Sequence, residues 1–254
     1  MVRVAGHSKW ANIKHKKSKE DARRGRLFTK LSRQIMVAAR DGGGDPSANV
    51  SLRLAIEKAR AANMPNEAIE RAIKRGTGEL EPVHYETLTY EGYAPGGVAV
   101  LVQAMTDNRN RTAGDLRHIF SRHDGSLGEV GSVAWMFDAK GQVEVDRQGA
   151  PDPDEMLLLA AEAGAEDVET DDEERYIVLT ALQDLDKVRR ALEEQGLHVL
   201  SAEPTYRPQT TMELDEEQAR KVLKLIEALE EYDDVQEVYT NLELSDELLA
   251  KLEV

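Results

Sequence analysis

The first 40 residues carry a run of cations interleaved with an indole, a combination suited to nucleic-acid chemistry. Lysine side chains neutralise phosphates and release counterions, and a tryptophan ring can stack on an unpaired base. The predicted contacts in this N-terminal arm are Lys9, Trp10, Lys14, His15, Lys16, Lys17 and Lys19. A solvated arm whose tryptophan is tucked into a helical core is the alternative interpretation.

A predicted helix follows the arm and presents further cations. Apolar residues recur at helical spacing from Ala22 to Ala38. The cations lie three, four or seven residues apart, so we expect them to share one face, with successive members roughly 5 Å apart. They are Arg23, Arg26, Lys30, Arg33 and Arg40, with Arg24 beside them. No acidic residue lies between Asp21 and Asp41, although exposed helices normally mix charges. This face therefore predicts a polyanion-binding surface.

Two short helices follow, over residues 47–62 and 66–75, joined by a turn that contains Pro65. One interpretation is a helix-turn-helix, in which Arg71, Lys74 and Arg75 face a groove. The proline in the turn and the shortness of the second helix favour a plain three-helix packing unit instead.

The segment Asp107–Thr112 precedes another predicted helix, which we expect to begin at Thr112. Its Arg109 and Arg111 are candidates for holding a phosphate or an RNA backbone at the helix N-terminus. A capped loop whose arginines pair with the acidic surface explains the same residues equally well.

The sequence lacks the residues that several kinds of metal, cofactor and catalytic site require. The chain has no cysteine, which excludes disulfides, zinc ribbons, thiol catalysis and iron–sulfur clusters. Gly125, Gly128 and Gly131 do not match a nucleotide fingerprint and are typical of tight turns. His118 and His123 share a helix face poorly. We therefore expect no metal, no cofactor and no enzymatic activity; a small-molecule sensor lacks any motif.

Charge is distributed very unevenly along the chain. Residues 1–40 hold 12 Lys and Arg against 2 Asp and Glu, whereas residues 81–254 hold 15 against 40, within a net charge of −15. The basic end suits a polyanion. The acidic remainder stays soluble or meets a basic partner, such as ribosomal proteins or the transcription machinery. With no transmembrane stretch and no secretory signal, we expect a cytoplasmic protein with no membrane partner; a monomer is compatible with the sequence.

The hydrophobic period changes from helical to two after residue 83. We predict an α+β fold of three domains: an N-terminal helical domain and two ferredoxin-like α/β domains, one inserted in the other. The predicted boundaries are 1–78, 83–137 with 208–244, the inserted 138–207, and a C-terminal helix over 245–254. Within them Asp45 is expected to cap the second helix, and 132–137 and 236–244 are expected to be strands.

Seven segments together resemble the YebC/PmpR family. They are Gly6–His15, Arg24–Leu31, Asn63–Pro65, Tyr90–Tyr93, Thr106–Thr112, Gly125–Gly128 and Gly131–Phe137. The resemblance runs over essentially the whole chain, and its first and last segments are highly specific.

The resemblance implies three domains, no catalysis and a cytosolic regulator of gene expression. Bacterial members are commonly described as DNA-binding transcriptional regulators. Related proteins act in translation, including a mitochondrial translational activator and bacterial members linked to ribosomes stalled on proline-rich stretches. We keep both hypotheses: a DNA-binding transcriptional regulator, and a ribosome- or RNA-binding translation factor that contacts ribosomal or transfer RNA.

Overall fold

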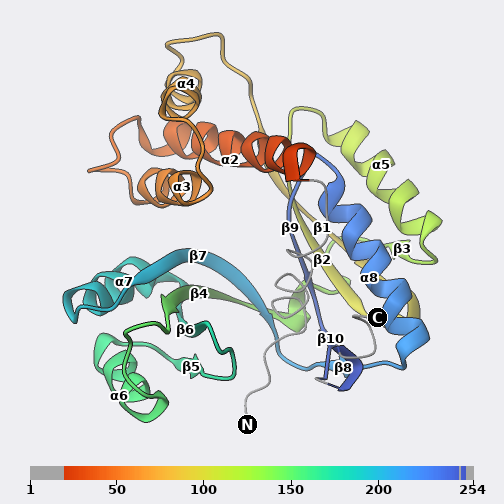
Figure 1. Cartoon of the computed structure of the whole chain (residues 1–254). Coiled ribbons are helices and arrows are strands. Elements are labelled where there is room, and N and C mark those ends of the chain that lie inside the picture. The colour runs from red at the N-terminus through yellow and green to blue at the C-terminus, as the bar shows by residue number, and fades with distance from the viewer. Residues whose placement is uncertain (1–19, 246, 250–254) are drawn as a thin grey trace. The chain divides into compact units, whose positions relative to one another are not determined.

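In the computed structural model, which describes residues 20–245 and 247–249, three helices come first along the chain. They are α2 (Glu20–Gly42), α3 (Val50–Ala61) and α4 (Asn66–Thr77), coloured red to orange in Figure 1. The apolar stripe of α2, which includes Leu31 and Ile35, is buried against the other two helices. The helical part therefore has a hydrophobic core of its own.

The start of α3 differs from the predicted one. Asn49 caps the helix, because its side chain accepts a hydrogen bond from the N–H of Leu52 at 3.0 Å. Asp45 closes a turn instead, accepting from the N–H and hydroxyl of Ser47 at 2.9 and 2.7 Å. The buried amide of Asn49 also donates to two backbone carbonyls at 2.8 Å each. A buried amide with three partners fixes the helix start more firmly than an exposed aspartate.

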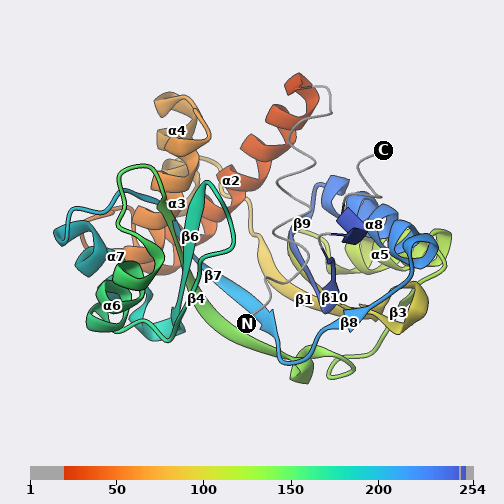
Figure 2. The same cartoon turned by 60° about the horizontal axis from the view of Figure 1, so that its bottom comes forward.

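An antiparallel sheet follows, in the order β3-β1-β2-β9. Its strands are β1 (Glu86–Tyr93), β2 (Ala99–Thr106), β3 (Ser126–Leu127) and β9 (Val235–Thr240), with the turn η1 (Pro95–Gly97) after β1. Helices α5 (Arg109–Arg122) and α8 (Glu216–Glu231) cover one face of this sheet (Figures 1 and 2). A ferredoxin-like βαββαβ sheet has its strands in the spatial order second, third, first, fourth. In this sheet those places are held by β3, β1, β2 and β9. The strand in the place of the third, β1, therefore comes first in the chain.

Helix α5 begins three residues before the predicted start at Thr112. Asn108 is its cap, and the Asn108 side chain accepts a hydrogen bond from the N–H of Arg111 at 3.1 Å. The hydroxyl of Thr112 is buried and lies 2.8 Å from that of Thr106. It is therefore committed to a tertiary contact and does not cap the helix.

The segment 132–137, predicted as a strand, contains the 3-10 turn η2 (Ala134–Met136). Two of its backbone N–H groups, and that of the preceding Gly131, donate to the buried carboxylate of Glu91. This carboxylate accepts three hydrogen bonds of 2.7 Å each, from the N–H groups of Gly131, Val133 and Ala134. Burial alone would raise the pKa of Glu91, but these three hydrogen bonds hold it below its usual value. Because its donors are used in this way, the segment cannot join a ladder, and the next strand begins at Phe137.

Residues Asp138–Arg207 form a compact unit of their own. Its elements are β4 (Phe137–Asp146), α6 (Pro153–Ala163), β5 (Asp167–Glu169), β6 (Arg175–Ala181), η3 (Leu182–Asp184), α7 (Leu185–Glu194) and β7 (Val199–Pro208). The sheet order β5-β6-β4-β7 is that of a ferredoxin-like βαββαβ unit. Helices α6 and α7 pack side by side against this sheet (Figure 2). The predicted fold class, an α+β protein with N-terminal helices and ferredoxin-like sheets, is confirmed.

The predicted strand 236–244 is divided between two sheets. After β9 ends, β10 (Leu242–Glu243) pairs in parallel with β8 (Met212–Glu213). Asn241 lies at the break, and its side-chain oxygen accepts the N–H of Ala99 at 2.8 Å in place of a ladder carbonyl. Ser245 caps a final turn, accepting from the N–H of Leu248 at 3.3 Å. Within the described ranges, no helix has the length and apolar character needed to cross a membrane.

Candidate nucleic-acid interface

Three cations on the predicted basic face of α2 have partners within the protein. The Lys30 ammonium donates to the backbone carbonyl of Glu230 at 2.8 Å. The Arg26 guanidinium lies 3.5 Å from the carboxylate of Glu231, between two largely exposed side chains. Arg33 reaches the same edge, where α8 leads into β9. We call Arg26, Lys30 and Arg33 the docked face.

Arg33 meets the carboxylate of Asp234, which is only 3% exposed. The Arg33 Nη1 atom lies 2.9 Å from Oδ1 and also donates to two backbone carbonyls at 2.7 and 3.1 Å. The other oxygen, Oδ2, accepts from Arg111 at 2.9 Å, from the hydroxyl of Thr112 at 2.7 Å and from the hydroxyl of Tyr232 at 3.2 Å. The carboxylate therefore joins α2 to the first turn of α5 and the entry to β9.

The ionisation states at this contact follow from its geometry. Burial alone would raise the pKa of Asp234, but the hydrogen bonds from Arg111 and Thr112 and the charge of Arg33 hold it below its usual value. Burial lowers the pKa of Lys30, and the neighbouring carboxylates offset this only in part. Asp234 is therefore a carboxylate at neutral pH and pairs with the Arg33 guanidinium.

The loop before α5 uses Arg111 for structure. Its guanidinium lies 2.8 Å from the carboxylate of Asp107 as well as 2.9 Å from that of Asp234. Arg109 lies 3.9 Å from the carboxylate of Glu86 and is mostly exposed. The sequence allowed two roles for Arg111, a phosphate contact or an ion pair within a capped loop. The geometry of Arg111 matches the second role.

Arg40 lies near the end of α2 and also has partners. Its Nε atom is 2.7 Å from the carboxylate of Asp41, and its Nη1 donates to the carbonyl of Tyr85 at 2.6 Å. Arg24 is exposed at the other end of the helix. Arg23 lies in α2, but its side chain is outside the description. The predicted arm contacts also lie outside the described residues; they are Lys9, Trp10, Lys14, His15, Lys16, Lys17 and Lys19.

Helix α4 carries three exposed cations. Arg71, Lys74 and Arg75 are exposed, and within the described part of the chain none of them has a hydrogen bond or ion pair from its side chain. The opposite face of α4 buries Ile69 and Ala72. The cations therefore project from a helix that is firmly held by the helical core.

These three residues were considered in the sequence only as part of a helix-turn-helix and were left out of the predicted contacts. The signal that would have found them is the spacing of Arg71 and Arg75, one helical turn apart on one face. The sequence could not show that α2 packs beside this face of α4 and forms a pocket with it.

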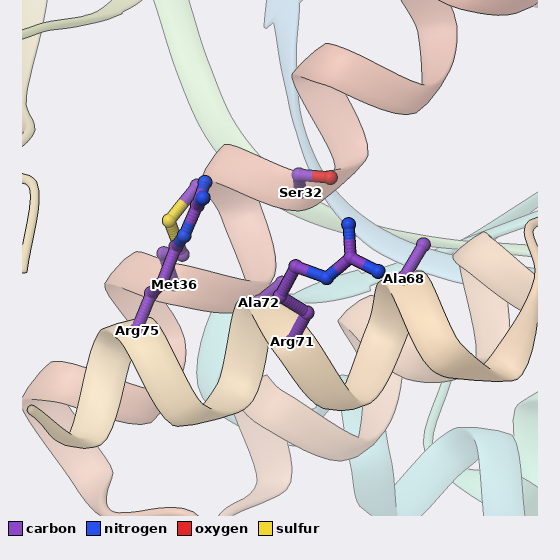
Figure 3. A pocket seen from close by; sticks show the side chains of 6 residues that line it. All are labelled: Ser32, Met36, Ala68, Arg71, Ala72 and Arg75. Atoms are coloured by element: carbon purple, nitrogen blue, oxygen red, sulfur yellow. The ribbon is translucent and has the colours of Figure 1, made fainter. Parts of the chain in front are cut away.

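A pocket of about 150 Å³ lies between α2 and α4. It is lined by Ser32, Met36, Ala68, Arg71, Ala72 and Arg75. Figure 3 shows the guanidinium groups of Arg71 and Arg75 rising from the same side of α4 toward α2, with the Ser32 hydroxyl across from them. A Cβ atom at Gly76 would lie 2.4 Å from the Met36 carbonyl oxygen, so glycine is what allows the two helices to approach this closely.

Comparisons with known proteins cover most of the chain. Residues 8–79 match the TACO1/YebC protein N-terminal domain, and residues 85–242 match the TACO1/YebC second and third domain. A relative from Natranaerobius thermophilus is 54% identical over 97% of this chain and 99% of its own length. One from Halothermothrix orenii is 56% identical over 98% and 99%. Both are named probable transcriptional regulatory protein.

A solved structure is also similar. It is the crystal structure of a conserved hypothetical protein from Aquifex aeolicus, 52% identical, with a TM-score of 0.86 over 95% of this chain and 99% of that one. The similarity therefore extends through the helical part and both sheet-containing parts.

Proposed function

The chain belongs to the TACO1/YebC family, and from this premise we propose that it is a cytoplasmic, non-enzymatic regulator of gene expression that binds nucleic acid. The proposal takes DNA as the target and transcription as the regulated process, in keeping with the names of the relatives. Its acidic α/β parts would meet a basic partner, such as a component of the transcription machinery.

The observation that carries the proposal is the unpaired charge on α4. Arg71, Lys74 and Arg75 are exposed cations with no side-chain partner among the described residues. Exposed helical cations usually gain from nearby acidic side chains. A row of unpaired cations on a well-anchored helix instead suits the evenly spaced phosphates of a nucleic acid, whose neutralisation releases counterions.

The docked face of α2 contributes to this proposal differently. Its Lys30 and Arg33 already donate to carbonyl and carboxylate oxygens within the protein. These atoms serve a phosphate only after leaving those partners. We therefore place the primary contact on α4 and on the arm that precedes α2, and we keep the docked face as a secondary surface.

Charge reversal on α4 tests the proposal. Each phosphate contact contributes about tenfold in affinity at 0.1 M salt, because the affinity falls with a log–log slope of about −0.9 per phosphate for duplex DNA. Arg71→Glu combined with Lys74→Glu should therefore weaken binding to a mixed-sequence 20-base-pair duplex by about 50-fold or more. Fluorescence anisotropy measures the dissociation constant, and circular dichroism checks the fold.

The matched control is Arg117→Glu combined with Arg122→Glu on α5. It changes the net charge equally and replaces two exposed arginines. We expect at most a few-fold change in affinity for the control. Equal losses in the two double variants would mean that net charge, and not the α4 surface, governs binding, and the proposal would fail.

The translation alternative is favoured by the charge distribution, since residues 81–254 hold 40 acidic against 15 basic residues. Such a surface fits basic ribosomal proteins while the basic end contacts RNA. Cross-linking in cells, with sequencing of both the DNA and the RNA recovered, separates the two. Discrete promoter DNA supports transcription. Recovery of ribosomal or transfer RNA, with cross-links concentrated at a few nucleotides, supports the alternative function instead. That function is a translation factor that relieves stalling on proline-rich sequences.

A further inference from the structure

We propose that the pocket between α2 and α4 is a phosphate-binding site that holds one phosphodiester group of the bound nucleic acid. Arg71 and Arg75 supply the charge, Ser32 supplies a hydroxyl donor, and the apolar wall receives part of the adjoining sugar. This inference rests on the proposed function and assigns it a particular subsite.

Two arginines line the same pocket. Arg71 and Arg75 are one turn apart, so their like charges repel each other along the helix. Glu67 lies four residues before Arg71, a spacing that allows an ion pair, yet the structure records none between them. The Arg71 side chain instead reaches over the pocket toward α2, as Figure 3 shows. An anion that bridges the two guanidinium groups would turn their repulsion into two attractions.

Ser32 adds a hydroxyl group to the pocket lining. A serine or threonine inside a helix commonly donates to the carbonyl one turn earlier, as Thr29 does to Gly25 at 3.1 Å. Ser32 makes no such side-chain hydrogen bond among the described residues. Ser32 lines the pocket across from Arg71, and its hydroxyl is available to a phosphate oxygen.

The pocket is small, and two of its walls are held in place. A volume of about 150 Å³ is well below the roughly 300–1,000 Å³ of sites for whole small-molecule ligands, so a phosphate with part of a sugar is a better fit than an entire cofactor. Met36 is 7% exposed and Ala72 is 3% exposed, so two of the walls are held by the helical core. The close crossing at Gly76 fixes the distance between the helices. The site is therefore built before the ligand arrives.

A charge-preserving substitution separates this pocket from a merely basic surface. Lysine keeps the charge of arginine but loses the planar fork that binds two phosphate oxygens at once. Arg71→Lys combined with Arg75→Lys should weaken binding to a mixed-sequence 20-base-pair duplex by about tenfold, with little change in the salt slope. Arg117→Lys combined with Arg122→Lys replaces two exposed arginines on α5, outside the predicted binding surfaces, and should leave affinity unchanged.

A second variant fills the pocket without touching charge. Ala68→Leu adds apolar bulk at the wall and should also weaken binding about tenfold, while thermal unfolding confirms that the fold is kept. If both pocket variants bind like the wild type while Arg71→Glu with Lys74→Glu does not, the pocket inference is overturned and the proposed function survives. If none of these variants changes affinity, the proposed function itself is overturned.

Free phosphate is the other source of the same chemistry. Inorganic phosphate at 10 mM, compared with chloride at equal ionic strength, tests it through the melting temperature. Suppose that phosphate raises the melting temperature of the wild type but not that of the double variant Arg71→Lys with Arg75→Lys. If the two proteins also bind nucleic acid with equal affinity, the pocket binds a small anion and our assignment is wrong. Weakened nucleic-acid binding in the pocket variants, together with little stabilisation by free phosphate, supports the assignment.

Discussion

Asp234→Ala tests how α2 is attached to the sheet of the neighbouring α/β part. The substitution removes the acceptor shared by Arg33, Arg111 and Thr112. Arg33 keeps two backbone carbonyl acceptors, but it loses its carboxylate partner while its side chain is only 11% exposed. The loss should therefore reach the stability of the fold and not only a surface contact.

The magnitude follows from three unequal contributions. The charged hydrogen bond to Arg33 is largely buried and is worth about 2 kcal/mol. The bond to Arg111 is worth less than about 1 kcal/mol, because that side chain is 45% exposed and screened by solvent. The buried hydroxyl of Thr112 adds about 1 kcal/mol. The sum is about 3 kcal/mol, at the lower end of the roughly 3–5 kcal/mol measured when one partner of a buried ion pair is removed.

Urea unfolding at pH 7, followed by circular dichroism, measures this loss. Asp233→Ala is the matched control, since Asp233 is adjacent and exposed and offers Arg33 its backbone carbonyl, which the substitution keeps. We expect the control to change the free energy of unfolding by no more than about 0.5 kcal/mol. A difference between the two variants below about 1 kcal/mol would refute the claim that the Asp234 carboxylate anchors α2.

Three further outcomes are expected from the same measurement. The pKa of Asp234 is lowered in the folded protein. The stabilisation by its carboxylate is therefore fully present above the ordinary aspartate pKa of about 3.9 and is lost as the pH falls through the lowered pKa. The difference in the free energy of unfolding between wild type and Asp234→Ala should therefore become smaller in acid. Gly76→Ala should destabilise by about 1–3 kcal/mol, because the added Cβ meets the Met36 carbonyl at 2.4 Å. Gly25→Ala, with nothing within 4 Å, should be neutral or stabilise by up to about 1 kcal/mol; if the two glycine variants behave alike, steric crowding at the helix crossing is not the cause. Glu91→Gln should cost about 2 kcal/mol, because the amide NH2 replaces one of the two acceptor oxygens and leaves at least one of the three N–H groups unpaired. An unchanged midpoint would show that the loop does not depend on this carboxylate.

The fold class was predictable because it depends on local patterns. Helical spacing at the N-terminal end and period-two strands afterwards are properties of neighbouring residues. Asp152 and Asp215 cap α6 and α8 with their side chains, as aspartates at helix starts commonly do. The predicted cap Asp45 and the predicted helix start at Thr112 were wrong, because Asn49 caps α3 and Asn108 caps α5.

The predicted strand at 132–137 failed for a similar reason. Its β-branched and aromatic residues favour a strand locally, but the carboxylate of Glu91, more than 35 residues earlier, takes its backbone donors. A single buried acceptor therefore overrides the propensity of a whole segment. No pattern within the segment could have indicated this.

The basic face of α2 shows why charge patterns alone do not assign a partner. A run of cations beside an acidic part of the same chain can meet either that part or a polyanion. The internal partner is always present at high effective concentration, and Lys30 and Arg33 are found with it. The structure therefore gives the two residues internal roles, and their contact with nucleic acid stays a prediction.

This competition has a consequence for experiments on α2. Reversing Arg33 to Glu would place a second carboxylate beside Asp234, so we expect the free energy of unfolding to fall before nucleic-acid affinity can be judged. Reversing Arg71 breaks no hydrogen bond or ion pair of its side chain among the described residues, so a change in affinity there reports mainly binding. Charge reversal on α2 is therefore expected to lower the free energy of unfolding, whereas charge reversal on α4 is expected to lower nucleic-acid affinity. Loss of affinity without loss of stability on reversing Arg33 would return α2 to the centre of the interface.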